Sequence, residues 1–325
     1  MKLAVVMRPC RSGKRPIVTT PSASLTRPGL NAYIALISLG FVWGAFFALS
    51  RFAGETDITP MVLVSYIVMA ELPFFYLICW WRGQFPRVWR PASMIFYLMA
   101  ATFGYFIPAV LELHAAPIIG AGLLTIFVSM TPLVTVLLAF MMRTEAASLR
   151  KLAGVLVGTL ALLPMMLSDD IIMPAPALAM KGFSLALLVA LCYGLYHNLV
   201  AKYWPEGEDA WQLATGETVA GLFVLVPFSL FVYGIEPVPL SGFAMPIVFA
   251  SYLLLSMASI WLYFYLLKAA GPIFTSLAGF VSLVAGVLLG IVLFGERHPP
   301  WIVLCILAMI AAIWLTSTSK QADES

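Results

Sequence analysis

The chain has 325 residues, of which 62% are hydrophobic and only 10% are charged. A soluble domain of this composition would expose large adhesive apolar patches, so the composition excludes an ordinary soluble enzyme and predicts a membrane protein. The formal net charge of +3 comes mostly from a basic N-terminal segment and gives no indication of nucleic-acid binding.

Ten apolar stretches follow one another along the chain. A helix of about 20 apolar residues crosses the hydrocarbon layer of a bilayer once, whereas the strands of a membrane barrel would show short alternating runs, which we do not find. The predicted fold class is therefore an all-α membrane protein with ten transmembrane helices. The predicted spans are 31–51, 60–81, 94–113, 117–141, 152–168, 182–203, 211–234, 246–269, 271–294 and 300–317.

Basic residues predict the orientation of these spans, because cytoplasmic loops retain Lys and Arg. With ten spans and the N-terminus inside, fifteen of the eighteen basic residues fall on the cytoplasmic side. We therefore expect a multi-pass protein of the bacterial inner (plasma) membrane with both termini in the cytoplasm. Its predicted parts are a basic tail (1–30), a first five-helix half (31–168), a periplasmic linker (169–181), a second five-helix half (182–317) and a short cytoplasmic tail (318–325).

The two halves resemble each other in sequence. The segment LGFVWGAFFALSR at 39–51 aligns with VALCYGLYHNLVA at 189–201, which pairs Trp43-Gly44 with Tyr193-Gly194. Each half holds an odd number of spans, so the second half must enter the membrane from the opposite side. Inverted repeats of this kind are typical of secondary transporters, in which two halves exchange roles around a central site.

Three segments, in this order and spacing, carry a resemblance to a known family. They are LGFVWGAFFALS in the first span, SMTPLVTVLLAF leading to Glu145 and LAGVLVGTLALL, and SLVAGVLLGIVLFGE in the ninth span. Between residues 31 and 317 the chain resembles the drug/metabolite transporter superfamily, and within it the EamA-type transporters of ten spans. The resemblance implies a transporter that works by alternating access, with export as the expected direction.

Two glutamates lie deep inside the predicted spans, where an ionised side chain costs ~3 kcal/mol on insertion scales. Glu71 is eleven residues into the second span, near the midplane, and Glu217 is six residues into the seventh span, its counterpart in the other half. We expect both to face the central cavity and to bind a cationic group or a proton. The structural alternative for each is a hydrogen bond to a neighbouring helix.

Aromatic residues predict the walls of the same cavity. His197 follows Tyr193 by four residues and shares its helix face, and the repeat matches Tyr193 with Trp43. Tyr66 precedes Glu71 by little more than one helical turn. We expect these four side chains to contact the substrate, although a lone histidine in a span is more often bonded to another helix.

The charge inventory favours an amino acid, an amine or a similar zwitterion or cation, since no Lys or Arg lies deep in a span to neutralise a phosphate. A multidrug efflux transporter and a sugar-phosphate or nucleotide-sugar carrier are the alternatives within the same architecture. An intramembrane enzyme or receptor is the alternative of another class, for which we find no catalytic motif or signalling domain. We expect no enzyme activity, cofactor, metal or nucleic-acid partner, and either a monomer or a homodimer, with proton coupling as an open option.

Overall fold

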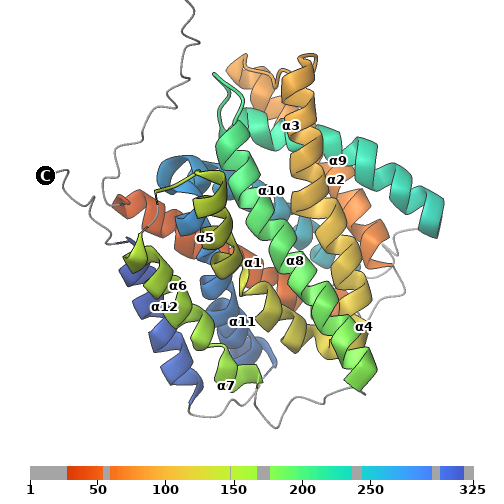
Figure 1. The fold of residues 1–325 in the computed structure, drawn as a ribbon. Coiled ribbons are helices and arrows are strands. Elements are labelled where there is room, and N and C mark those ends of the chain that lie inside the picture. The colour runs from red at the N-terminus through yellow and green to blue at the C-terminus, as the bar shows by residue number, and fades with distance from the viewer. Residues whose placement is uncertain are drawn as a thin grey trace, which may run out of the picture.

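The computed structural model describes residues 28–53, 59–146, 148–166, 176–235, 244–294 and 301–317, and these ranges form a bundle of helices (Figure 1). Residues 1–27 of the predicted N-terminal tail, the predicted C-terminal tail and most of the predicted linker lie outside the described residues. In chain order the helices are α1 (Leu30–Ala53), α2 (Pro60–Arg82), α3 (Pro91–Ala101), the π-helix η1 (Thr102–Phe106), α4 (Ile107–Val128), α5 (Thr131–Met142), α6 (Leu149–Leu160), α7 (Leu163–Met166), α8 (Pro176–Tyr203), α9 (Ala210–Tyr233), α10 (Ala244–Ser276), α11 (Ala278–Phe294) and α12 (Ile302–Ser317).

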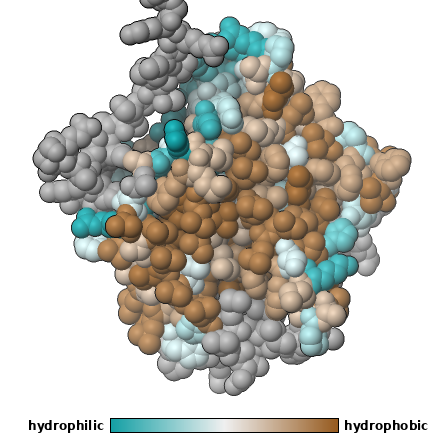
Figure 2. Space-filling view, viewed as in Figure 1, coloured by the Kyte–Doolittle hydropathy of each residue, from teal (hydrophilic) through white to brown (hydrophobic). Residues whose placement is uncertain are grey.

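The outer surface of the bundle is apolar. Figure 2 shows hydrophobic side chains covering the middle of one face, with hydrophilic residues gathered toward its edges. Large side chains such as Phe231, which is 91% exposed, point outward, as they do when lipid replaces water around the protein. Within the described ranges, six helices are long and apolar enough to span a membrane and three apolar helices are shorter. The protein is therefore a multi-pass membrane protein.

Several predicted spans differ from the observed helices, and proline accounts for two of the differences. The predicted span 117–141 is interrupted between α4 and α5 beside Pro132, and the predicted span 152–168 is interrupted between α6 and α7 beside Pro164. Proline removes one helix hydrogen bond and clashes with the preceding turn, so a helix ends more easily there than it continues.

The predicted loop between the third and fourth spans is a further difference. We expected a break between residues 113 and 117, but α4 runs through them without interruption. Helix α4 packs along α8, and this packing favours a continuous helix over a loop. The prediction of a separate loop at this point is therefore wrong.

A kink divides α10 at Gly271, where the predicted eighth and ninth spans meet. The φ of Gly271 is 81°, a left-handed value that glycine adopts at little cost. Just after the kink, the N–H of Ile273 donates to Oε1 of Glu145 at 3.0 Å, and Lys151 binds the other carboxylate oxygen. The loop that follows α5 therefore holds the turn between the two parts of α10.

The main packing partners join the first half of the chain to the second. Helix α1 packs on α10 and α11, and its repeat counterpart α8 packs on α4 and α5. A Cβ added at Gly44 would lie 2.7 Å from Cβ of Ala285, and one added at Gly194 would lie 2.6 Å from Cγ1 of Val134. The two glycines that align in sequence thus bring equivalent pairs of helices together. Helices α2 and α9 pack on each other, as do α6 and α12.

Polar side chains join α2, α3 and α9 at one end of the bundle, and we call Arg82, Tyr97, Glu208 and Asp209 the end cluster. Arg82 donates to Oδ2 of Asp209 at 2.5 Å, and the hydroxyl of Tyr97 donates to Glu208. Asp209 is also the N-cap of α9, where it accepts from the backbone N–H of Gln212 at 3.0 Å. These bonds connect the first half of the chain to the second half at that end of the bundle.

Candidate functional site

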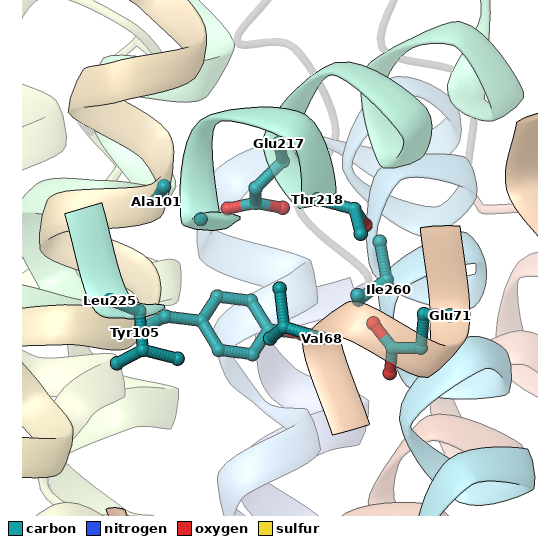
Figure 3. Close-up of a pocket in the computed structure, with 9 residues that line it drawn as sticks. Val68, Glu71, Ala101, Tyr105, Glu217, Thr218, Leu225 and Ile260 are labelled. Carbon is teal, nitrogen blue, oxygen red and sulfur yellow. The ribbon is translucent and has the colours of Figure 1, made fainter. Parts of the chain in front are cut away.

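A small cavity lies among the central helices, between α2, α9, α10 and the segment that contains η1 (Figure 3). Its volume is about 10 Å³, close to the space that a single water molecule needs. This cavity therefore has no room for an organic molecule in this conformation. The lining residues are Val68, Glu71, Ala101, Tyr105, Glu217, Thr218, Gly221, Leu225 and Ile260.

Glu71 enters the cavity from α2 and is completely buried. Neither of its carboxylate oxygens has a hydrogen-bond partner among the residues that the structure describes. A buried polar group without a partner is unfavourable unless a ligand, a water molecule or a proton satisfies it. Figure 3 shows its carboxylate directed toward the space beside Val68 and Ile260, so the unpaired group lies at the edge of the cavity.

Glu217 enters the same cavity from α9 and is 2% exposed. Its Oε1 accepts from the hydroxyl of Tyr196 at 2.8 Å, while its Oε2 has no partner within the described ranges. In Figure 3 the ring of Tyr105 is drawn below Glu217, and Val68 lies between this ring and Glu71 in that view. One oxygen of Glu217 is thus fixed by the protein and the other is left for a ligand.

A group of three rings lies behind Glu217. Tyr196 and Tyr263 stack with their centroids 4.8 Å apart and their planes 12° from parallel. Nδ1 of His197 lies 3.1 Å from the hydroxyl oxygen of Tyr263, and the ring centroids of His197 and Tyr263 are 5.4 Å apart. These side chains come from α8 and α10, so they tie both helices to the carboxylate on α9.

Comparison with known proteins identifies the family. The model of the EamA-like transporter family matches the chain twice, over residues 30–167 and 180–318. The protein belongs to the EamA-like transporter family. One solved structure, described only as "Crystal structure of protein", superposes with a TM-score of 0.70 at 13% identity, covering 88% of this chain and 96% of that one. At this identity the likeness shows a shared fold alone. No curated protein matches the chain.

The two family matches correspond to the two halves that the sequence alignment predicts. The expected membership of the EamA-type transporters is therefore confirmed. Of the side chains that we expected at the site of this EamA-like protein, Glu71 and Glu217 line the cavity. His197 is buried behind them and meets Tyr263 rather than the cavity.

The other three expected side chains lie elsewhere in this conformation. Nε1 of Trp43 donates to Oγ of Ser259 at 2.8 Å, and the hydroxyl of Tyr193 donates to Oε1 of Glu112 at 3.2 Å. Tyr66 packs against a small apolar cluster that includes Val62 and Leu63. These three residues therefore stabilise contacts around the cavity, and their contact with a substrate stays a prediction.

Sequence reasoning missed Tyr105, Thr218 and Tyr196. Tyr105 belongs to η1, whose wider turn shifts the helix face by about one residue relative to a 3.6-residue period. Tyr196 adjoins His197, but the four-residue spacing that predicts a shared helix face joins His197 to Tyr193 and not to Tyr196. A π-helix has no reliable sequence signature, so only the glycine-aromatic run TFGYF offered a signal.

Neither a metal site nor a disulfide is found at the cavity among the described residues. Within the described ranges, no group of three His, Cys, Asp or Glu side chains could hold a metal ion. The cysteines in those ranges are free thiols in separate helices. The lining residues that carry a carboxylate or a hydroxyl are Glu71, Glu217, Tyr105 and Thr218.

Proposed function

We propose that this protein is a secondary transporter that moves a small organic metabolite with an ammonium group, such as an amino acid or an amine, across the membrane by alternating access. The observation that carries the proposal is the meeting of Glu71 and Glu217, from equivalent helices of the two halves, in one central cavity. Membership of a transporter family supports transport rather than catalysis.

Alternating access is supported by the way the halves pack. In an inverted repeat, exchange of the two halves should map each helix pair onto an equivalent pair. The contacts of α1 with α10 and α11 match those of α8 with α4 and α5, while α2–α9 and α6–α12 map onto themselves. Such an arrangement can open toward either side with similar contacts.

The charge of the cavity supports the substrate class. Its lining includes two carboxylates, and none of the lining residues is basic. An ammonium group would supply the missing partner of Glu71, whereas a phosphate would lose its hydration without gaining a cation. A proton can take the place of the ammonium when the site is empty, which gives a route to proton coupling.

The side of the membrane follows from the basic residues. Lys268 donates to the backbone oxygen of Glu208 at 3.4 Å, so it lies at the end cluster together with Arg82. The basic bias assigns this end to the cytoplasm, in a bacterial inner membrane with both termini inside. Export is the direction that the family resemblance favours. An impermeant thiol reagent added to intact cells should fail to label the variant Arg87→Cys, and labelling would reverse the orientation.

Uptake into proteoliposomes tests the function directly. A panel of amino acids and primary amines should include substrates with saturable flux, and an imposed pH gradient should change that flux if protons are exchanged. Sugar phosphates should neither be transported nor compete. The double variant Glu71→Gln/Glu217→Gln should lose the flux, because neither amide can neutralise an ammonium group.

A matched control uses a glutamate outside the membrane. Glu206 is exposed in the loop between α8 and α9, so Glu206→Gln makes the same chemical change away from the cavity and should leave flux unchanged. Saturable uptake of a sugar phosphate, or full amine flux in the double variant, would show that the substrate class is wrong.

A further inference from the structure

The side chains behind Glu217 link three helices of the second half through bonds and ring contacts. The hydroxyl of Tyr196 on α8 donates to Glu217 on α9. The ring of Tyr196 stacks on Tyr263 of α10, and the hydroxyl of Tyr263 meets Nδ1 of His197, again on α8. Glu217 is thus connected to an imidazole that does not line the cavity.

We propose that Tyr196, Tyr263 and His197 form a positioning chain that holds the Glu217 carboxylate toward the cavity, so that His197 influences transport without contacting the substrate. A carboxylate on a single helix can rotate about three bonds, and one hydrogen bond removes much of that freedom only if its donor is itself held. The stacked rings hold the donor, and the bond between His197 and Tyr263 holds the stack.

The π-helix η1 gives Tyr196 the space it needs. A Cβ added at Gly104 would lie 2.7 Å from Cζ of Tyr196, which is closer than nonbonded carbon atoms approach. The ring therefore fits only because residue 104 has no side chain. Since π-helical turns often occur at functional sites, η1 both contributes Tyr105 to the cavity and admits the ring that positions Glu217.

Infrared spectroscopy tests the chain without a substrate. The carboxyl stretching bands of Glu217 are those lost in Glu217→Gln, and Tyr196→Phe should shift them because it removes the donor. If the chain positions the carboxylate, Tyr263→Phe and His197→Leu should shift the same bands, although the hydrogen bond to Glu217 comes from Tyr196. His197→Asn keeps a polar atom near the position of Nδ1 and should restore them.

Tyr265→Phe is the matched control, since Tyr265 lies on the same helix as Tyr263 and stacks on Trp261 instead. It should leave the Glu217 bands unchanged. Bands that shift in Tyr196→Phe but not in Tyr263→Phe or His197→Leu would overturn the proposal, because Tyr196 would then be held without the other two residues. Equal shifts in the Tyr265→Phe control would also overturn it.

Transport adds a second readout that rests on the proposed function. His197→Leu and Tyr263→Phe should raise the KM for a transported amine by about tenfold, with a smaller change in kcat. This is the effect of losing one charge-assisted hydrogen bond between the ammonium group and Glu217. A purely structural role would lower the amount of folded protein and leave KM unchanged. The two proposals can fail separately, because the infrared shifts do not require that an amine is transported.

Discussion

The central cavity and the end cluster both contain buried glutamates, but only one region satisfies them. Glu208 is 2% exposed, as is Glu217, and Glu71 is fully buried. Glu208 accepts from the hydroxyl of Tyr97 and, at 3.3 Å, from that of Ser93. Three of the four carboxylate oxygens of Glu71 and Glu217 have no partner within the described part of the chain.

Burial alone therefore does not separate a structural carboxylate from a functional one. A carboxylate that the protein has already bonded stabilises the helices around it, and its loss leaves its donors unpaired. An unbonded carboxylate at the same depth destabilises the folded state and persists where it gives a ligand something to bind. The hydrogen-bond partners of a buried carboxylate, which come from other helices, decide whether it is structural or functional.

The largest effect should come from removing the charge of Glu71. Glu71→Gln should lower amine flux in proteoliposomes at least about 100-fold, because no other group at that point of the cavity replaces its charge. The thermal unfolding temperature in detergent should not fall, since the carboxylate accepts no hydrogen bond from the described part of the chain. A variant that transports normally, or that unfolds much more easily, would place Glu71 with the structural carboxylates.

Next in size is the loss of the bonded carboxylate. Glu208→Ala should destabilise the protein by about 3 kcal/mol, because the hydroxyl of Tyr97 is left buried without its acceptor. The unfolding free energy should be measured alongside Tyr97→Phe and the double variant, which should cost much less than the sum of the two single changes. Additive costs would mean that the bond between them contributes little.

A smaller effect is expected at the half-satisfied carboxylate. Glu217→Gln keeps an oxygen that can accept from Tyr196, so the fold should be retained while the KM for an amine rises about tenfold. The predicted span limits also place Glu217 nearer the membrane surface than Glu71, where charge is better screened. Flux assays on both single variants give the comparison, and a larger loss in Glu217→Gln would reverse the ranking.

The smallest effect belongs to the exposed pair of the end cluster. The side chains of Arg82 and Asp209 are 37% and 32% exposed, and such pairs contribute less than about 1 kcal/mol. Arg82→Gln should change the unfolding temperature only slightly, and high salt should remove even that difference. A loss as large as that of Glu208→Ala would show that this pair is coupled to the buried bonds beside it.

Local sequence patterns predicted the helices better than their ends. Apolar length and the lack of alternation indicated membrane helices, and the repeated Trp43-Gly44 and Tyr193-Gly194 pairs pointed to two related halves. The breaks beside Pro132 and Pro164 depend on one residue each and are readable in principle. The continuous course of α4 across residues 113–117 cannot be predicted from the local sequence. The helix is stabilised there by packing with other parts of the chain.

The sequence by itself determined the class of protein and the rare charges that need an explanation. Hydrophobicity is a local property of each segment, and Glu71 and Glu217 are conspicuous because ionised groups at membrane depth are so costly. Only the tertiary structure decided which partners each charge has. The hydroxyl of Tyr196 on α8 donates to Glu217 on α9. Gly104, in the π-helix η1, leaves space for the ring of Tyr196. Those contacts depend on how helices cross, which no periodicity within one helix records.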